Sequence, residues 1–391
     1  MAVLDTADWE TRASALAARL DADLAAAGVL LDPAWRHAFA ATPRHRFVPR
    51  ILDDGMVVAQ GDPGWLDAVY ADESLAVQTQ PSETPGRAIP SSSSSKPTVM
   101  AMMLERLALR PGHRVLEIGT GTGYNAALLA HRIGGDAVHS IDLDPALVEA
   151  ARAHLAEIGL HPRLAAGDGA GGWPDRGPFD RIIATCAVTA IPPAWIDQLA
   201  EGGRIVAPLD AGSAGPLLVL DKTAADEVSG MIDPYPALFM PMRGEVDSPY
   251  GPGQEPAPAV TGIPHHGTST LDPAALLSRP ELALFLWLHA PGLQFGGGAE
   301  HGVVVAERGA ARAEVDLRPR ADGTWAVRQH GPYRLWDIIE HAVATFDALD
   351  MPDASRLGVT ALNVPDRQYV WLDDPDSDHC WPLIPPATFL R

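Results

Sequence analysis

The residues best suited to chemistry lie in one glycine-rich stretch, VLEIGTGTGYNAALLA, at residues 115–130. The two ends of this stretch have the composition of a buried strand and of a helix. Between them Gly119, Gly121 and Gly123 allow the backbone to turn sharply and to approach a bound molecule. Three alternating glycines weaken a fold unless something must come close, so we expect a ligand pocket here. A strand-to-helix corner without a ligand is the alternative.

The spacing of the glycines bears on the kind of ligand. A dinucleotide fingerprint places its third glycine three residues after the second, and that position is Tyr124. The G-x-G-x-G order found here, with Glu117 before it, resembles motif I of class I S-adenosylmethionine (SAM) methyltransferases. The resemblance implies SAM as cofactor, with S-adenosyl-L-homocysteine as its product. It also implies that the cofactor is bound by Glu117, Gly119, Thr120, Gly121 and Gly123.

Two acidic residues follow the next apolar segments. Asp142 ends the segment 137–141, and Asp168 lies between two glycines after the segment 163–166. Because open α/β sheets bind ligands outside the carboxyl ends of their strands, we expect both acids in the same pocket. Asp142, followed by Leu143, is the candidate for the cofactor ribose, and Asp168, followed by Gly169, is the candidate for the adenine. A helix cap or a solvated turn is the alternative for each acid.

Composition and charge limit the class of protein. A chain of 391 residues is long for a single core, so we expect two or three domains. The net charge of −21 works against binding nucleic acid. No apolar run approaches the roughly 18 residues of a membrane helix, and no secretory leader is visible, so we expect no membrane contact and a cytoplasmic location. Cys186 and Cys380 lie far apart and the 14 histidines lack metal-ligand spacing, so no metal site is expected.

The order of apolar segments predicts the elements that position these residues. Alternating strands and helices after residue 115 predict an α/β fold with a Rossmann-like doubly wound sheet, preceded by a helical cap. Pro, Gly and Ala concentrate at 248–264, which is typical of a linker, and further strand and helix patterns follow it. We therefore expect an N-terminal cap with substrate-side loops, a SAM-binding core, a linker and an additional C-terminal α+β domain, at residues 1–85, 86–245, 246–267 and 268–391.

Three segments before the glycine stretch indicate a narrower family. They are TPRHRFVPR, AVYADESLAVQ and SKPTVMA, at residues 42–50, 68–78 and 95–101. In this order they resemble the N-terminal region of protein L-isoaspartate O-methyltransferases, and G-D-G-x-x-G-W at 167–173 also matches that family. The resemblance covers about residues 40–245. It implies a class I SAM-dependent enzyme that methylates a carboxylate of a protein or peptide.

The acceptor side carries the main departure from the family. Ser95 matches the family serine that lines the isoaspartyl carboxylate, and the resemblance implies that Ser95 and its neighbour Ser94 orient the acceptor. Here a run of five serines followed by Lys96 replaces the usual Thr-Ile-Ser-Gln; a flexible linker is the alternative for this run. A carboxyl group with a free pKa near 4 is already ionised at pH 7, so positioning is expected to do most of the work.

Two substrates follow from the resemblance. The changed serine run and the added C-terminal domain resemble a family branch that accompanies the biosynthesis of graspetides and lanthipeptides. That branch methylates an aspartate in a cyclised ribosomal peptide precursor, which leads to aspartimide or isoaspartate. Repair of isoaspartyl proteins is the alternative. A binding protein without catalysis and a small-molecule methyltransferase are disfavoured, because the cofactor motifs are intact and the N-terminal segments match a family that acts on peptidyl acids.

The C-terminal domain is expected to recognise the peptide. Methyl transfer is complete within the first 245 residues, so the added domain serves stability or selection. It contains aromatic and arginine side chains, the types that dominate interface energy, and filling of the domain's own core is the alternative for each of them. These residues are Trp325, Tyr333, Arg334, Trp336, Tyr369 and Trp371.

Overall fold

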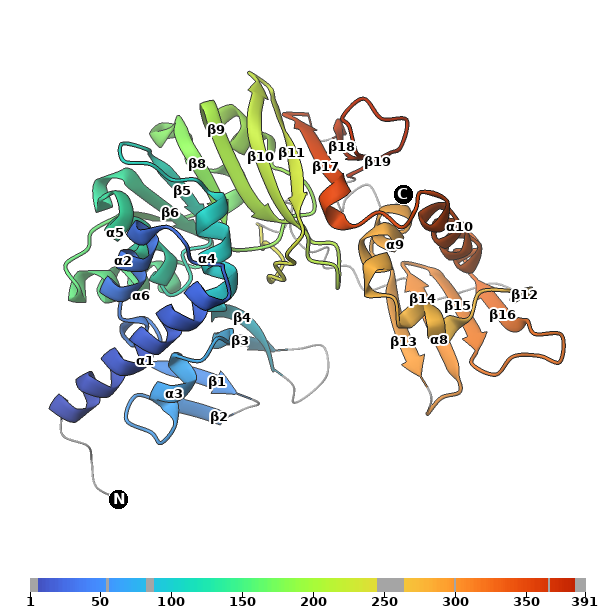
Figure 1. Ribbon diagram of the computed structural model, residues 1–391, viewed down its shortest axis with the longest axis horizontal. Helices are drawn as coiled ribbons and strands as arrows, with labels where there is room; N and C mark the ends of the chain where they lie inside the picture. The colour runs from blue at the N-terminus through green and yellow to red at the C-terminus, as the bar shows by residue number, and fades with distance from the viewer. Residues whose placement is uncertain are drawn as a thin grey trace.

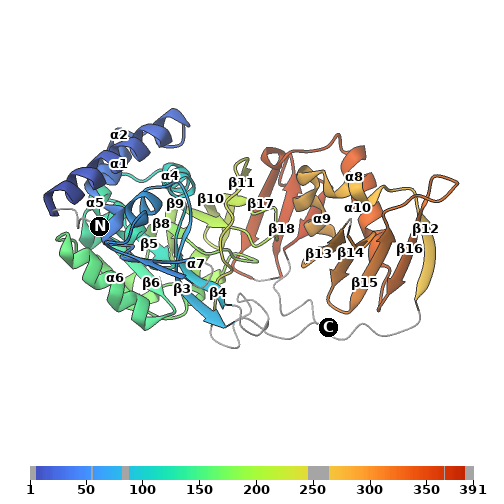
Figure 2. The ribbon, with the colours of Figure 1, turned by 90° about the horizontal axis from the view of Figure 1, so that it is seen from below.

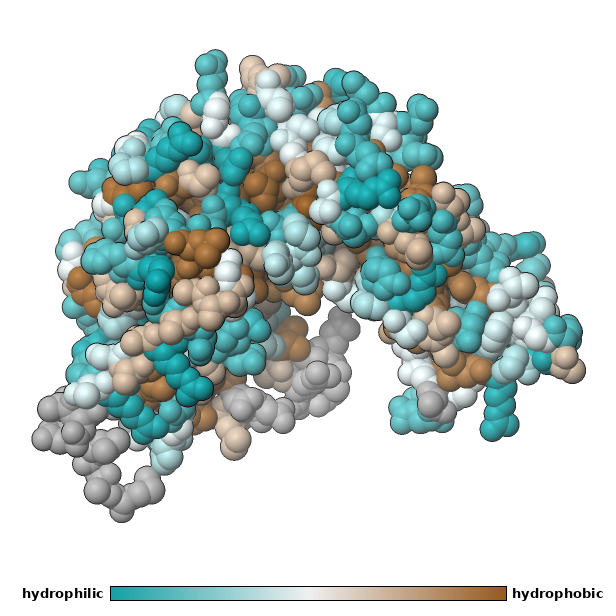
Figure 3. All heavy atoms as spheres, viewed as in Figure 1, coloured by the Kyte–Doolittle hydropathy of each residue, from teal (hydrophilic) through white to brown (hydrophobic). Residues whose placement is uncertain are grey.

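The computed structural model describes residues 6–53, 56–81, 88–244, 264–298, 300–364 and 366–383. Figure 1 shows an α/β part, which begins with the N-terminal helices, and a smaller five-stranded sheet at the other end of the molecule. Figure 2 shows the same arrangement from below. The face drawn in Figure 3 is largely hydrophilic and is hollowed between the two parts. In the described ranges no helix is long and apolar enough to cross a membrane.

The N-terminal residues form helices and two small hairpins. The helices are α1 (Thr6–Ala26), α2 (Pro33–Ala41), α3 (Trp65–Val69) and α4 (Pro97–Arg106). The hairpin strands are β1 (Arg50–Asp53) with β2 (Met56–Ala59), and β3 (Leu75–Pro81) with β4 (Ala88–Ser94); both pairs are antiparallel. The elements from α1 to β3 lie within the range expected for the cap, 1–85, whereas β4 and α4 lie in the range expected for the SAM-binding core.

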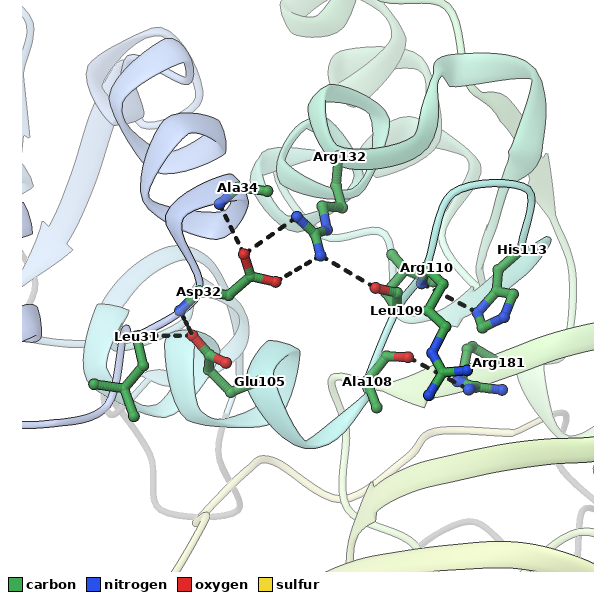
Figure 4. Close-up of polar contacts among 10 residues, drawn as sticks. All are labelled: Leu31, Asp32, Ala34, Glu105, Ala108, Leu109, Arg110, His113, Arg132 and Arg181. Carbon is green, nitrogen blue, oxygen red and sulfur yellow. Dashed lines mark hydrogen bonds and ion pairs between the residues drawn. The ribbon is translucent and has the colours of Figure 1, made fainter.

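An ion pair and backbone hydrogen bonds at the start of α2 hold the cap against the rest of the fold. Asp32 caps α2 through the amide of Ala34 at 2.8 Å and also pairs with Arg132 of α5 at 2.6 Å (Figure 4). The Glu105 carboxylate of α4 accepts hydrogen bonds of 2.7 Å from the amides of Leu31 and Asp32. Segments that are distant in the sequence therefore hold the cap against α4 and α5.

A ten-stranded mixed sheet forms the core. Its order is β19-β18-β17-β11-β10-β9-β8-β5-β6-β7, and the five strands from β9 to β7 in this order are parallel to one another. The parallel strands are β5 (Val115–Ile118), β6 (Val138–Asp142), β7 (Arg163–Ala166), β8 (Phe179–Ala184) and β9 (Leu199–Pro208), and the helices between them are α5 (Tyr124–Ile133), α6 (Pro145–Glu157) and α7 (Pro193–Gln198). β5 and β6 are buried throughout because helices cover both faces, as is typical of parallel sheets. The predicted fold class is confirmed.

The second sheet is wholly antiparallel and has the order β12-β16-β15-β14-β13. Its strands are β12 (His265–Ser269), β13 (Gln294–Gly298), β14 (Val303–Arg308), β15 (Ala311–Asp316) and β16 (Trp325–His330). The helices that accompany it are α8 (Pro273–Leu277), α9 (Ala283–His289) and α10 (Leu335–Ala348). The expected linker, 246–267, lies outside the described residues up to 263, and its last residues belong to β12.

The chain then returns to the first sheet, which differs from the expectation of one module over 268–391. β10 (Leu217–Ala224) and β11 (Glu227–Asp233) form an antiparallel pair, and β17 (Leu357–Leu362) adds to β11, followed by β18 (Gln368–Leu372) and β19 (Cys380–Pro382). In Figure 1 these red strands stand beside β11, away from the orange sheet. Every residue of β17 is buried, so this strand covers an edge that would otherwise be open. The sequence pattern did not reveal β17, since its buried run LGVTAL lacks a partner nearby in the sequence.

Candidate functional site

A pocket lies at the carboxyl ends of β5 and β6. From β5 the chain runs to β6 on one side, and it later crosses to β8 on the other side of β5. Open α/β sheets bind ligands at such a switch point. Residues from several regions line this pocket, among them the turn after β5, strand β4 and the segment 238–243.

The turn after β5 brings bare backbone to the pocket. Gly119 and Gly121 have φ angles of 96° and 51°, which glycine adopts without strain. A Cβ at Gly119 would lie 2.6 Å from Oγ1 of Thr185, and a Cβ at Gly121 would lie 3.7 Å from the carbonyl oxygen of Ser93. The turn therefore packs against the residue that follows β8 and lies next to the serine strand, residues 91–95.

The Asp142 carboxylate lines the pocket and is fixed by backbone amides. Its Oδ2 accepts a hydrogen bond of 2.8 Å from the Gly121 amide, and its Oδ1 accepts one of 3.1 Å from the Asp144 amide. Thr120 and Leu143 line the same wall. The cofactor candidates Gly119, Thr120, Gly121, Asp142 and Leu143 are thus brought together in one pocket wall.

Glu117 lies beneath this turn and does not line the pocket. Its carboxylate is fully buried and accepts hydrogen bonds from Nδ2 of Asn125 at 2.7 Å and from Oγ of Ser140 at 2.5 Å. Burial raises the pKa of Glu117 to about 7, and the two hydrogen bonds act in the opposite direction. Asn125 does line the pocket, and its buried Oδ1 has no hydrogen-bond partner among the described residues.

The remaining cofactor candidates lie at the margin of the pocket. Gly169 lines it, and its carbonyl oxygen accepts a hydrogen bond of 2.8 Å from the indole of Trp195. Asp168 does not line the pocket; its carboxylate caps the next turn by accepting a hydrogen bond of 2.9 Å from the amide two residues later. Gly123 also lies outside the lining, where a Cβ would come within 3.0 Å of the Ala151 Cβ. Gly123 therefore serves the packing of α5 on α6.

The serine run is a strand, so the alternative of a flexible linker is wrong. β4 pairs with β3, and its last residue, Ser94, is 2% exposed. Ser94 and Ser95 both line the pocket, as do residues of the glycine turn. Lys96 also lines it, and its ammonium group lies 3.4 Å from the Asp72 carboxylate. The predicted cofactor and acceptor residues thus face the same space.

Long-range contacts that the sequence did not reveal hold the serine strand in place. Nε2 of Gln78 donates a hydrogen bond of 2.7 Å to Asp144, and Oγ of Ser91 donates one of 2.9 Å to Oε1 of Gln78. The hydrogen bond from Gln78 lowers the pKa of Asp144. These contacts connect β4 to the start of α6, and no local pattern marks them because Gln78 and Asp144 are far apart in the sequence.

The segment 238–243, which we took only as a domain end, covers part of the pocket. The amide of Met242 donates to the carbonyl of Ala187 at 2.7 Å, and the amide of Ala187 donates to that of Met240 at 2.9 Å. Arg243 lines the pocket, and its guanidinium forms no ion pair with the described residues. Cys186 also lines it; burial raises the pKa of its thiol to about 12, so the thiol is neutral at pH 7 and is a poor nucleophile.

Comparison with known proteins identifies the family. A sequence model described as protein-L-isoaspartate(D-aspartate) O-methyltransferase matches residues 17–246. The protein-L-isoaspartate O-methyltransferase 1 of Anaeromyxobacter sp. is 39% identical over 232 residues, which are 59% of this chain and 96% of that protein. The protein-L-isoaspartate O-methyltransferase of Methylorubrum populi is 45% identical over 148 residues, which are 38% of this chain and 68% of that protein.

A solved structure extends the likeness in fold. A protein-L-isoaspartate O-methyltransferase of known structure aligns with a TM-score of 0.52 at 21% identity and covers 92% of this chain and 100% of its own. The shared fold therefore reaches beyond residue 246 into the C-terminal sheet. From the family match and the pocket together, the chain belongs to the protein-L-isoaspartate(D-aspartate) O-methyltransferase family and is a SAM-dependent carboxyl O-methyltransferase.

Proposed function

We propose that this enzyme methylates the free α-carboxylate of L-isoaspartyl residues in proteins or peptides. The observation that carries the proposal is the serine strand: β4 and the residue after it bring Ser94 and Ser95 to the same pocket as the glycine turn and Asp142. Hydroxyl donors in one pocket with a nucleotide-type wall suit an anionic acceptor beside a cofactor. The relatives that match this chain carry the same activity in their names.

The pocket suits SAM in four respects. The Asp142 carboxylate offers acceptor oxygens for the ribose hydroxyls, and Gly119 and Gly121 bring bare backbone to the same pocket. The unpartnered Oδ1 of Asn125 is an acceptor available to the ammonium group of the cofactor. Gly169, at the end of β7, is proposed to lie along the adenine, with Asp168 shaping its loop. When bound, SAM supplies an electrophilic methyl group on a sulfonium.

The protein's contribution is orientation and exclusion of water. An acceptor carboxylate is already ionised at pH 7, so no general base is required to activate it. Ser94 and Ser95 are proposed to donate hydrogen bonds that direct one carboxylate oxygen toward the methyl group. The apolar side chains of Met240 and Met242 line the pocket and are proposed to reduce the solvent around the reacting atoms. The neutral thiol of Cys186 takes no covalent part.

The test is methyl transfer to a matched set of peptides. One linear sequence carrying L-isoaspartate, the same sequence carrying L-aspartate, and a cyclised version carrying L-aspartate would be incubated with SAM, and base-labile methyl ester would be measured. We expect the isoaspartyl peptide to have a kcat/KM at least roughly a hundredfold above the linear aspartyl peptide, since a misplaced carboxylate loses alignment. Similar values for these two peptides would refute the proposal.

The cyclised peptide tests a second proposal, methylation of aspartate in a ribosomal peptide precursor to give aspartimide. Its support is the departure of the serine strand from the family wording and the additional C-terminal sheet. The solved relative that aligns over most of this chain shows that such an addition also occurs under the isoaspartate name, so the first proposal has the stronger support. A preference for the cyclised aspartyl peptide over the isoaspartyl one would reverse this order.

We also propose that C-terminal residues recognise the peptide substrate, although several of the candidate side chains are buried. Trp336 and Trp371 are 1% and 3% exposed, so they fill the core as the alternative held. Trp325 and Tyr333 are partly buried and pack against the same core. Arg334 is exposed and lies 3.7 Å from the Asp337 carboxylate, and Tyr369 is half-buried; of this group, Arg334 is the exposed side chain. Its replacement, Arg334→Ala, should raise the KM of a protein substrate without changing the KM of a short peptide. An unchanged KM for the protein substrate would exclude the contact.

A further inference from the structure

Arg44 is a fully buried arginine that contacts the end of the serine strand, residues 91–95, on the side away from the pocket. It lies in the short helix η1 (Arg44–Arg46) of the segment TPRHRFVPR, and its side chain has no exposed surface. No ion pair joins its guanidinium to any carboxylate in the described parts of the chain. Burial lowers the pKa of Arg44 to about 10, so the guanidinium still carries its charge at pH 7. A buried charge without a counter-ion needs a specific reason.

The guanidinium is satisfied by carbonyl oxygens from two separate segments. Nη1 donates to the carbonyls of Val69 at 2.8 Å and Ala71 at 3.0 Å, and Nη2 donates to that of Glu73 at 3.0 Å. Nη2 also donates to the carbonyls of Ser94 at 3.3 Å and Ser95 at 3.0 Å. Arg44 therefore joins the loop after α3 to the end of the serine strand.

The contacts with the serine strand determine which groups the strand presents. A carboxylate accepts hydrogen bonds and is repelled by carbonyl oxygens. A strand that binds the substrate carboxylate must therefore direct its carbonyl oxygens away from the pocket and its hydrogen-bond donors into it. The carbonyls of Ser94 and Ser95 are bound to the Arg44 guanidinium, while both residues line the pocket. The Arg44 interaction thus satisfies the groups that would oppose an anionic substrate.

The Ser94 hydroxyl has a further contact with the same arginine. Nε of Arg44 lies 3.4 Å from Oγ of Ser94, with the N–H directed at the oxygen. An oxygen that accepts from an N–H uses its own hydrogen elsewhere, and the described residues offer this hydroxyl no other hydrogen-bond partner. The hydroxyl hydrogen is therefore left for a ligand in the pocket.

We propose that Arg44 is a positioning residue, which orients the Ser94 hydroxyl and the carbonyls of Ser94 and Ser95 so that the serine strand accepts a carboxylate. This role rests on the proposed carboxyl methylation. Arg44 does not touch the substrate or the cofactor. It acts through Ser94, and its charge, placed behind the strand, also favours an anion in front of it.

A matched control is available in β8 of the ten-stranded sheet. Arg181 is 8% exposed and donates to the carbonyls of Leu107 at 2.7 Å and Ala108 at 3.3 Å, also without an ion pair among the described residues. It does not line the pocket. Replacing either arginine by lysine keeps the charge and removes the planar set of donors, so both variants should lose similar stability.

The first measurement is the split between the two substrates. We expect Arg44→Lys to raise the KM of an isoaspartyl peptide roughly tenfold or more, as expected for a lost charge-assisted hydrogen bond, with the Kd of SAM within about twofold of wild type. Arg181→Lys should change neither constant beyond that. In a Ser94→Ala background the effect of Arg44→Lys on peptide KM should shrink, because the two residues act together. Equal effects of the two arginine variants, or full additivity with Ser94→Ala, would overturn the proposal.

A second measurement needs no substrate, so it separates this proposal from the proposed function. Amide hydrogen exchange in residues 88–96 should quicken in Arg44→Lys and stay at the wild-type rate in Arg181→Lys. If Arg44→Lys fails to fold, the Arg44 Nε–H signal of 15N-arginine protein should still shift between wild type and Ser94→Ala. Unchanged exchange in folded Arg44→Lys, or an unchanged signal, would contradict positioning of the strand. Wild-type protein inactive on isoaspartyl peptide would instead refute the function alone.

Discussion

The two sides of the pocket are held by different kinds of contact. The proposed cofactor side, residues 119–121 with Asp142, is fixed by the backbone amides of Gly121 and Asp144, which both donate to the Asp142 carboxylate. The proposed acceptor side, residues 91–95, is fixed by side chains from remote segments, chiefly Arg44 and Gln78. The residues of the cofactor side lie close together in the sequence and form a recognisable motif. The residues that hold the acceptor side come together only when the cap has folded. This difference predicts that the two sides can be damaged separately.

The largest effect should come from filling the glycine turn. Gly119→Val would place a branched side chain at a φ of 96° and against Thr185, and strain of this kind costs about 2–4 kcal/mol of folding free energy. SAM affinity should fall below detection in calorimetry. Gly112→Ala is the control, because Gly112 has a φ of 89° with no atom within 4 Å of a Cβ. Equal loss of SAM binding in both variants would mean that strain alone, and not the pocket, explains the glycine.

A smaller effect is expected from the carboxylate on the same side. Asp142→Ala removes a charge-assisted hydrogen bond, which corresponds to about 1.5–3 kcal/mol or roughly ten- to a hundredfold in SAM affinity. The Kd of SAM would be measured by calorimetry, with Asp136→Ala as the control, since the Asp136 side chain is fully exposed. An unchanged Kd in Asp142→Ala would remove this residue from the cofactor site.

The acceptor side should respond in the opposite pattern. Ser95→Ala is expected to lower kcat/KM for an isoaspartyl peptide by roughly tenfold, because one donor to the carboxylate is lost, and to leave the Kd of SAM unchanged. Ser278→Ala, which alters an exposed hydroxyl at the end of α8, should have no effect on either constant. Full activity in Ser95→Ala, or a trapped methyl ether on Ser95, would reject this role.

The smallest effect concerns the buried acid under the cofactor side. The folded pKa of Glu117, about 7, lies above its ordinary value, so the folded state holds the proton more tightly than the unfolded state. The contribution of Glu117 to stability is therefore present at low pH and is lost as pH rises through about 7. Glu117→Gln should weaken this pH dependence by about 1–2 kcal/mol between pH of about 5 and 8. The free energy of unfolding would be measured in urea at each pH for wild type and Glu117→Gln. The same pH dependence in both proteins would contradict the raised pKa of Glu117.

The sequence was sufficient for most of the fold and for one side of the site. The alternation of strands and helices and the glycine spacing are local patterns, so they predicted the central sheet, the turn and Asp142. The return of β17 to β11 was not predicted, because a strand added to a distant edge leaves no mark on its neighbours in the chain. Arg44 was noticed only as part of a family segment, since its six hydrogen bonds exist only after the cap has folded.

The most direct measurement of the proposed activity uses one peptide that contains both an L-isoaspartyl and an L-aspartyl residue. After incubation with the full chain and SAM, fragmentation mass spectrometry would locate the added methyl group. The two carboxylates then compete for the same serine strand under identical conditions. The account predicts methylation at the isoaspartyl residue, with the aspartyl residue unmodified. Methyl ester or aspartimide at the aspartyl residue, with the isoaspartyl residue untouched, would contradict it.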